Sequence, residues 1–312
     1  MNPKVIGIPR LADKHFVSYD NDQFGYRKWL PQSGKEPSLV IIGVHGISGH
    51  SGDYANLAAH LQKHHPDIAV YAAETRGQGM DAKPFRRGDI SHRSSWYKDL
   101  TTFTRLVQGK HPKSKVIWYG ESMGSLIVMH AYDQTLPADK VPEAIIISSP
   151  IVDVESKLPP WKMLAVRISA FLLPKLRVSL ETLSDGQRAV VTKDDIHEEQ
   201  AKKNPWYIRR YTLRLLIKLG DMARAMDARA AAIRCPVLVL HGGKDIFTEP
   251  DSVTAFYKHF PETANGMAKT RHYYPDSFHL LMYDHDRDKI FKDVSSWLDR
   301  FMGNEVTNKN NQ

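Results

Sequence analysis

The chain has very little of what marks several large classes of protein. Its single cysteine, Cys235, excludes an intrachain disulfide, so we expect a reducing, cytoplasmic environment. No apolar run approaches the roughly 18 residues that a membrane-spanning helix needs. Residues 1–10 contain no apolar segment of the kind that a secretory signal carries, and we expect no such signal. Because no group of Cys and His has metal-binding spacing, we also expect no metal.

The charge that is present leans to the positive side, with 43 Lys and Arg against 35 Asp and Glu and a net charge of +8. It is densest in residues 151–234, which hold 16 basic and 10 acidic residues. No zinc-finger spacing, basic helix with heptads or aromatic RNA-binding strand accompanies these charges, so we expect no nucleic-acid partner. Solvated helix faces are the simplest interpretation of most of the basic residues.

Short apolar runs alternate with helix-like stretches along most of the chain. Several runs are rich in Val and Ile without strict polar alternation, which is typical of strands buried on both faces of a parallel sheet. The runs lie at residues 39–44, 68–73, 116–119, 144–148, 237–240 and 272–274. Ahead of them, residues 15–19 and 24–30 flank a turn-prone Asn-Asp pair and predict an antiparallel edge hairpin. The pattern therefore predicts an α/β fold with a mostly parallel eight-stranded sheet.

The alternation of strand and helix stops after Pro150. Residues 151–234 show helical patterns and no convincing strand, which predicts an all-helical cap (lid) inserted between strands six and seven. Residues 1–150 and 235–302 would then form the core. Residues 303–312 are rich in Asn, and we expect a flexible tail there.

Ser122 lies in a Gly-Glu-Ser-Met-Gly segment between a predicted strand and an apolar helical pattern. A G-x-S-x-G nucleophile requires this strand-turn-helix context, because the glycines allow a sharp turn that lifts the serine hydroxyl out of the sheet. A Ser/Gly turn that merely opens a helix is the structural alternative. We predict that Ser122 is a nucleophile.

A serine hydroxyl is a weak nucleophile at neutral pH and needs a base that is oriented by a carboxylate. Asp245 and His279 each lie in a loop after a predicted strand, and they follow Ser122 in an order that many serine hydrolases use. We therefore predict Asp245 as the acid and His279 as the base. Asp153 and Glu249 compete with Asp245 for the role of the acid. We assign four other histidines to strands, packing, turns or charged surface, namely His45, His241, His272 and His285.

Acyl transfer also needs two N–H donors at the developing oxyanion, each worth roughly 10²–10³ in rate. One candidate is the backbone N–H of Met123, which follows the nucleophile. The other is the N–H of Ile47, since Gly46 permits close backbone approach in the loop after residues 39–44. We assign the tight turn at residues 76–79 to packing, not to chemistry.

These segments resemble the monoglyceride lipase/lysophospholipase family of α/β hydrolases over residues 15–301. The resemblance rests on H-G-x-x-x-H-S-x-x-Y at residues 45–54, R-G-Q-G at 76–79 and G-E-S-M-G at 120–124. Met80 departs from the family, which often has a small polar residue there, and the cap matches only weakly in sequence. Because the cap decides the substrate in this family, the departures bear on substrate identity.

The resemblance implies an α/β-hydrolase fold with a cap at residues 151–234. It implies a catalytic triad of Ser122, Asp245 and His279. It also implies an oxyanion hole made by the N–H groups of Ile47 and Met123.

Residues 161–173 predict an apolar helix with two basic residues interspersed. One face carries large apolar side chains, which we predict to bind the substrate's acyl chain: Trp161, Leu164, Ile168 and Phe171. Further apolar side chains lie on the other side, and such a helix must bury both faces or meet lipid. Peripheral membrane contact through the cap is therefore one hypothesis, and a well-packed lid without lipid contact is the other.

The predicted function is hydrolysis of carboxylic esters of lipid-like substrates, such as a monoacylglycerol or a lysophospholipid, through an acyl-enzyme. The chemistry needs no metal and no organic cofactor. One alternative is a small-ester carboxylesterase. Another is an amidase or aminopeptidase of the proline-iminopeptidase kind, for which Glu198 and Glu199 are weak candidates to bind a substrate amine. A non-catalytic binding protein would commonly lose a triad member, and a dehalogenase would need Asp in place of Ser122.

Overall fold

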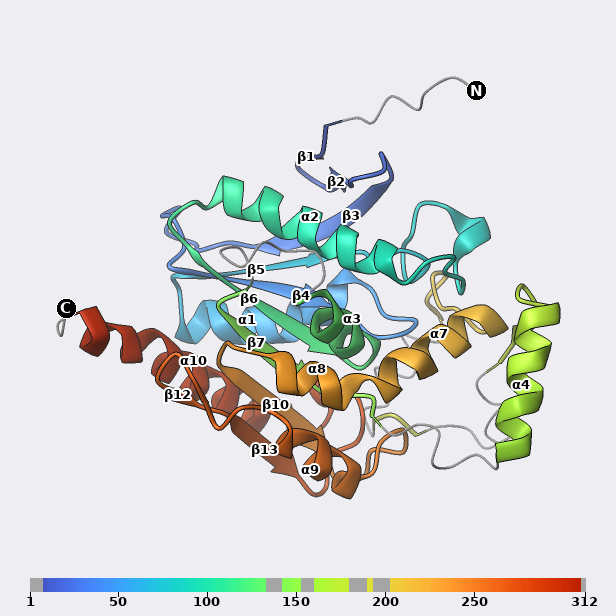
Figure 1. Cartoon of the computed structure of the whole chain (residues 1–312). Coiled ribbons are helices and arrows are strands. Elements are labelled where there is room, and N and C mark those ends of the chain that lie inside the picture. Colours follow the sequence, from blue (N-terminus) through green and yellow to red (C-terminus); the bar gives the residue numbers. More distant parts are fainter. Residues whose placement is uncertain (1–7, 133–141, 153–159, 180–189, 193–202, 310–312) are drawn as a thin grey trace.

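A central sheet with helices on both faces organises the molecule in a computed structural model of the chain (Figure 1). The structure describes residues 8–132, 142–152, 160–179, 190–192 and 203–309. In this part of the chain the sheet has nine strands in the order β1-β2-β3-β5-β4-β6-β7-β10-β13. Their bounds are β1 (Arg10–Leu11), β2 (His15–Val17), β3 (Gln23–Trp29), β4 (Leu39–Val44), β5 (Ile68–Ala73), β6 (Lys115–Glu121), β7 (Ala144–Ser148), β10 (Val237–Gly242) and β13 (Thr270–Tyr274).

The sheet is antiparallel at one edge and parallel elsewhere. The pairs from β1 to β5 are antiparallel, and those from β5 through β4 to β13 are parallel. The mostly parallel sheet and its edge hairpin are thus confirmed. The predicted count of eight strands is one short, because β1 has two residues and so carries no readable periodicity.

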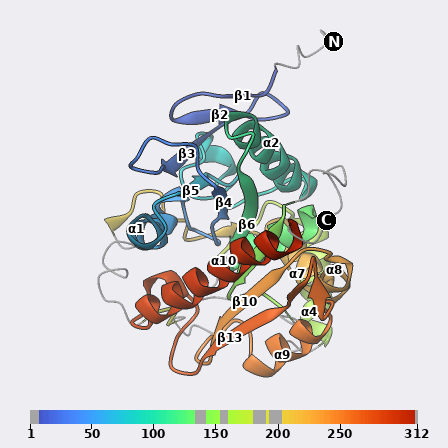
Figure 2. The same ribbon diagram turned by 90° about the vertical axis from the view of Figure 1, so that its left-hand side faces the viewer.

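Helices cover the two faces of this sheet. Every residue of β4, β7 and β10 is buried, which explains why their Val and Ile runs do not alternate with polar residues. Buried side chains of α2 and α3 pack on one face, and those of α1 and α10 pack on the other. Figure 2 shows α1 and α2 on opposite sides of the sheet. The helices are α1 (Ala55–His64), α2 (Ser94–Lys110), α3 (Met123–Ala131), α9 (Pro250–Lys258) and α10 (Arg287–Lys309). The short elements outside the segment between β7 and β10 are η1 (Ser51–Tyr54), η2 (Pro84–Arg86), β11 (Thr263–Ala264), β12 (Met267–Ala268) and η5 (Leu281–Tyr283).

The insertion between β7 and β10 is not all helical. It contains α4 (Pro160–Leu172), β8 (Arg177–Val178), β9 (Tyr211–Thr212), α7 (Leu213–Arg224) and α8 (Met226–Ala232). β8 and β9 pair antiparallel, with Arg177 opposite Thr212, so the prediction of an all-helical cap is wrong. Two-residue strands that are far apart in the sequence leave no pattern there to find.

Helices α8 and α4, near the two ends of this insertion, differ in how they contact the core. Met226 and Ala230 of α8 belong to the same buried cluster as α3, so the end of the insertion packs into the core. Arg167 of α4 reaches Asp221 of α7 at 3.0 Å, and α4 lies at the right-hand edge of the molecule (Figure 1). The division into a core and a cap at residues 151–234 stays a prediction.

The last helix extends further than the sequence pattern indicates. α10 runs to Lys309, into the segment expected as a flexible tail. Among the described residues, no helix combines the length and the apolar character needed to cross a membrane.

Candidate active site

Ser122 occupies a sharp turn between β6 and α3. Its backbone has φ 52° and ψ −117°, a strained conformation that is typical of a nucleophile on such a turn. A Cβ at Gly124 would lie 1.9 Å from the carbonyl oxygen of Val44, and one at Gly120 would lie 2.6 Å from that of Gly124. Only glycine fits at these two positions, so the sequence enforces the turn that presents Ser122.

His279 joins Ser122 to Asp245 in a continuous hydrogen-bonded chain. His279 Nε2 lies 2.8 Å from Ser122 Oγ, and its Nδ1 lies 2.7 Å from Asp245 Oδ2. An ionised carboxylate only accepts, so Nδ1 carries the proton and Nε2 is left to accept from the serine hydroxyl. All three side chains are buried. The arrangement can remove a proton from Ser122 and store it on the imidazole.

Asp245 is held in its charged form although it is buried. Burial would raise the pKa of Asp245, but His279 and the backbone N–H groups of Phe247 and Thr248 outweigh it and hold that pKa below its usual value. Phe247 N–H donates to Asp245 Oδ1 at 2.8 Å. The His279 loop is held in turn by Ser149 Oγ, which donates to the His279 carbonyl at 2.5 Å. These contacts fix the carboxylate and the imidazole relative to each other.

The two predicted oxyanion donors belong to segments that meet at the nucleophile. Met123 opens α3, so its N–H has no partner within the helix. Ile47 lies in a turn that Gly49 N–H closes by donating to Gly46 O at 3.1 Å. A Cβ on Gly46 would lie 3.2 Å from Ser122 Cβ, so this turn lies directly against the nucleophile. That these two N–H groups donate to an oxyanion stays a prediction.

The competing residues lie elsewhere or have other partners. Asp153 lies outside the described residues, and Glu249 is the N-cap residue of α9, whereas the carboxylate on His279 is that of Asp245. His241 accepts a hydrogen bond from Arg271 Nε at 2.9 Å. Burial and Arg271 lower the pKa of His241 to about 4, so it stays neutral.

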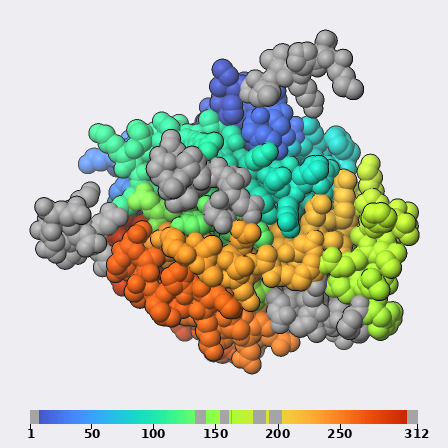
Figure 3. Space-filling model, viewed as in Figure 1, coloured from blue at the N-terminus to red at the C-terminus, as the bar shows by residue number. Residues whose placement is uncertain are grey.

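The four apolar residues predicted to bind substrate face away from the core. The exposed fractions of Trp161, Leu164, Ile168 and Phe171 are 68%, 60%, 51% and 84%. The space-filling view shows α4 at the surface of the molecule (Figure 3). In this structure the face is therefore open to solvent, and its contact with a substrate stays a prediction.

Gln78 bears on the site although the sequence pattern assigned its turn to packing. Its Oε1 accepts a hydrogen bond from Ser48 N–H at 3.1 Å, in the turn that carries Ile47. Its neighbour Arg76 does serve packing, through a buried ion pair with Asp99 at 2.7 Å. The signal for Gln78 is its position in the turn that follows the parallel strand β5, at the edge where strand ends converge.

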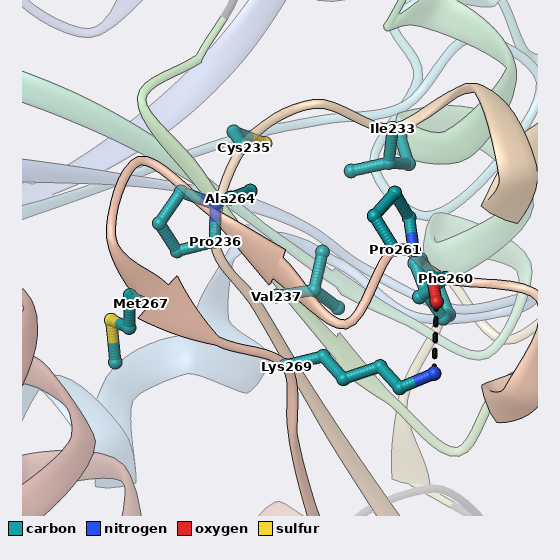
Figure 4. Close-up of a pocket in the computed structure, with 9 residues that line it drawn as sticks. All are labelled: Ile233, Cys235, Pro236, Val237, Phe260, Pro261, Ala264, Met267 and Lys269. Atoms are coloured by element: carbon teal, nitrogen blue, oxygen red, sulfur yellow. Dashed lines mark hydrogen bonds between the residues drawn. The ribbon is translucent and has the colours of Figure 1, made fainter.

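A small surface pocket elsewhere offers no comparable chemistry (Figure 4). Lys269 lines it, but its ammonium group donates to the carbonyl of Phe260 at 2.8 Å and so caps the end of α9. Cys235 also lines it, and burial raises the pKa of this thiol to about 12. A thiol that stays protonated is inert, so this pocket holds no nucleophile.

The fold and the hydrogen-bonded chain together define the class of protein. A serine on a strand-to-helix turn, joined through a histidine to a carboxylate at the edge of a mostly parallel sheet, is the arrangement of the α/β hydrolases. Residues 35–286 match the family model described as serine aminopeptidase, S33, and the chain belongs to this family. The relatives confirm the predicted likeness to monoglyceride lipases.

Three relatives illustrate this likeness. The chain is 26% identical over 291 residues to a Mycolicibacterium smegmatis protein named monoacylglycerol lipase, and the matched region covers 92% of this chain and 96% of that protein. It matches the crystal structure of Paleococcus ferrophilus monoacylglycerol lipase with a TM-score of 0.69 at 21% identity, over 88% and 98% of the two chains. It matches a soluble variant of Saccharomyces cerevisiae monoglyceride lipase, solved with a substrate analog, with a TM-score of 0.76 at 18% identity, over 96% and 98%. At these identities the two structures establish the fold.

Proposed function

We propose that this protein is a serine hydrolase that cleaves carboxylic esters of lipid-like substrates, such as monoacylglycerols or lysophospholipids. The observation that carries the proposal is the chain from Ser122 Oγ through His279 to Asp245, with separations of 2.8 and 2.7 Å. The names of the relatives support the ester of a single acyl chain as the substrate class. No metal or organic cofactor enters the chemistry.

The mechanism follows from the geometry. Ser122 Oγ attacks the ester carbonyl while His279 Nε2 takes its proton, and Asp245 stabilises the resulting imidazolium. The N–H groups of Ile47 and Met123 bind the negative oxygen of the tetrahedral intermediate. His279 returns the proton to the leaving alcohol, which departs and leaves an acyl-enzyme. In the second half, water attacks the acyl carbon while His279 Nε2 takes its proton. His279 then gives this proton to Ser122 Oγ as the bond to the acyl group breaks, which releases the fatty acid and restores the Ser122 hydroxyl.

The alternative substrates differ in what the enzyme must recognise. A small-ester carboxylesterase needs no acyl-binding surface, whereas an aminopeptidase needs a carboxylate for the substrate's amine. Glu198 and Glu199, the candidates for that carboxylate, lie outside the described residues. The exposed apolar face of α4 favours a long acyl chain, because a soluble lid has little reason to keep such side chains in water.

Peripheral contact with a membrane is the second part of the proposal, for a protein that acts in the cytoplasm. Exposed apolar side chains continue past the end of α4, since Leu172, Leu173 and Leu176 are 67%, 58% and 46% exposed. Exposed Lys175 lies in the same segment. Apolar side chains with an adjacent cation match the needs of a helix that rests on an anionic lipid surface.

Hydrolysis of p-nitrophenyl esters from acetate to palmitate tests the proposal, with monoacylglycerol, lysophospholipid and prolyl p-nitroanilide as further substrates. We expect a preference for long chains, release of fatty acid from one of the two lipids, and no activity in Ser122→Ala. Full activity of Ser122→Ala would overturn the mechanism. A preference for acetate and butyrate would replace the lipid substrate by a small ester, and cleavage of the anilide alone would replace it by a peptide.

A further inference from the structure

The turn that carries Ile47 contains a strained residue. The turn, here called the oxyanion turn, comprises Gly46 to Gly49 and is closed by a hydrogen bond from Gly49 N–H to Gly46 O at 3.1 Å. Ser48, its third residue, has φ 60°, in the left-handed region that favours glycine. A residue other than glycine holds this conformation only where its surroundings enforce it.

The core restrains the backbone of the oxyanion turn at two points. Thr75 N–H donates to His45 Nε2 at 3.1 Å, so the proton of this ring lies on Nδ1, which donates to Gly46 O at 2.9 Å. Gln78 Oε1 accepts from Ser48 N–H at 3.1 Å. Neither contact holds the side chain of Ser48.

The side chain of Ser48 is held by the insertion instead. Its Oγ donates to the Tyr211 hydroxyl and also lies 3.1 Å from the carbonyl oxygen of Ile208. The Tyr211 hydroxyl in turn donates to the Ile208 carbonyl at 2.9 Å. Tyr211 is 2% exposed, so its hydroxyl has been withdrawn from water in order to make these contacts.

Tyr211 itself is fixed by the residues that follow it. Thr212 N–H donates to Gly88 O at 2.9 Å, and Thr212 Oγ1 donates to Asp89 Oδ1 at 2.7 Å. Arg214 forms an ion pair with the same carboxylate. This part of the insertion is thus anchored on the core, and it offers Ser48 a rigid partner.

We propose that Tyr211 is a positioning residue that holds Ser48 in its left-handed conformation and so aims the N–H of Ile47 at the oxyanion. The inference rests on the proposed function and goes beyond it, because it makes the docked insertion part of the oxyanion hole. Tyr211 touches no reacting atom, and its effect passes through Ser48. A misaimed donor loses most of its contribution, which is about 10²- to 10³-fold in rate for one donor.

Tyr211→Phe removes the hydroxyl and keeps the ring, so it is the variant to measure. We expect kcat for a soluble p-nitrophenyl ester to fall about tenfold or more with KM changed less than about twofold, because the hole acts on the transition state. The Ki of an alkyl trifluoromethyl ketone, whose adduct with Ser122 carries an oxyanion, should rise by the same factor. Tyr207→Phe is the matched control, since Tyr207 is 48% exposed in the same segment, and it should leave both values unchanged.

Variants of Ser48 separate positioning from a loss of folding. Ser48→Ala keeps the strain and loses the hydroxyl, so its kcat should fall as in Tyr211→Phe. Ser48→Gly relieves the strain, so it should retain most of the activity. In the double variant, adding Tyr211→Phe to Ser48→Gly should then change kcat very little. Normal kcat and Ki in Tyr211→Phe and in Ser48→Ala, beside an inactive Ser122→Ala, would overturn the inference and leave the proposed function standing.

Discussion

Glu121 lies directly opposite Ser148 across the parallel strands β6 and β7, one residue before the nucleophile. Its side chain is 1% exposed, and its Oε1 has no hydrogen-bond partner among the described residues. Burial and the charge of Asp53 raise the pKa of Glu121 to about 8. Among the described residues, Glu121 interacts electrostatically with Asp53, Tyr54, Tyr119 and Tyr283. None of these is a cation, so the folded protein holds Glu121 as a neutral acid at neutral pH.

This buried acid makes stability depend on pH. Between about pH 4.5, the usual value, and about pH 8, the folded state keeps the proton of Glu121 and the unfolded state has lost it. Unfolding then releases a proton, so the free energy of unfolding falls as the pH rises through this window. Glu121→Gln removes this dependence and should gain on the order of a few kcal/mol relative to wild type between pH 4.5 and 8.5. Denaturant melts of both proteins at several pH values measure the free energy of unfolding.

Glu262→Gln is the matched control for Glu121→Gln. The side chain of Glu262 is 86% exposed, so its amide variant should keep the pH dependence of the wild type. Parallel stability curves for wild type and Glu121→Gln from pH 4.5 to 8.5 would contradict the assignment of a neutral acid.

Asp245→Asn should inactivate the enzyme while preserving its fold. Asp245 Oδ1 accepts from the Phe247 N–H, so the amide oxygen of Asn should keep that contact and its NH2 group should face His279 Nδ1. The imidazole then adopts the wrong tautomer, and kcat for a p-nitrophenyl ester should fall about 10⁴-fold. Asp276→Asn is the control, because Asp276 is 80% exposed and forms a surface ion pair with Lys244. Near-normal kcat in Asp245→Asn would assign the acid to another residue.

Gly124→Ala should be destabilising, because its Cβ would meet the Val44 carbonyl oxygen at 1.9 Å. The backbone of β4 or α3 must move to admit it, and we expect a loss of about 3 kcal/mol or more in the free energy of unfolding. Gly109 in α2 has nothing within 4 Å of its added Cβ, so Gly109→Ala should stabilise the helix by up to about 1 kcal/mol. Urea melts of the two variants should move in opposite directions, and equal effects would argue against the close packing of the turn.

The exposed face of α4 should bind anionic vesicles. The double variant Phe171→Glu and Leu172→Glu places charge where the side chains are 84% and 67% exposed, so it should reduce co-sedimentation with phosphatidylglycerol vesicles about tenfold or more at low salt. Its kcat for a short soluble ester should stay within about twofold. Ile8→Glu is the control, since Ile8 is 83% exposed near the amino terminus, and it should bind as the wild type does. Unchanged binding of the double variant, or no binding of the wild type, would remove the membrane contact from the proposal.

Local sequence patterns predicted most of the fold because the features involved are contiguous. Val- and Ile-rich runs predict the buried strands. Two glycines between a strand and a helix predict the turn at Ser122. The strand pair β8–β9 and the strand β1 were not foreseen, since two residues are too few to show a period. Whether Phe171 is exposed was left open by the sequence, because a helical pattern predicts an apolar face but not what covers that face.

The sequence by itself determined that a serine, an aspartate and a histidine each follow a predicted strand. Their order along the chain then predicted Ser122, Asp245 and His279 as partners in a catalytic triad. Only the tertiary structure decided that they meet within 2.8 and 2.7 Å, since separations along the chain do not set separations in space. The same holds for Ser48 and Tyr211, which come together because the insertion docks on the core through Asp89. A hydrogen bond depends on a few tenths of an ångström, and packing of the whole chain fixes distances at that scale.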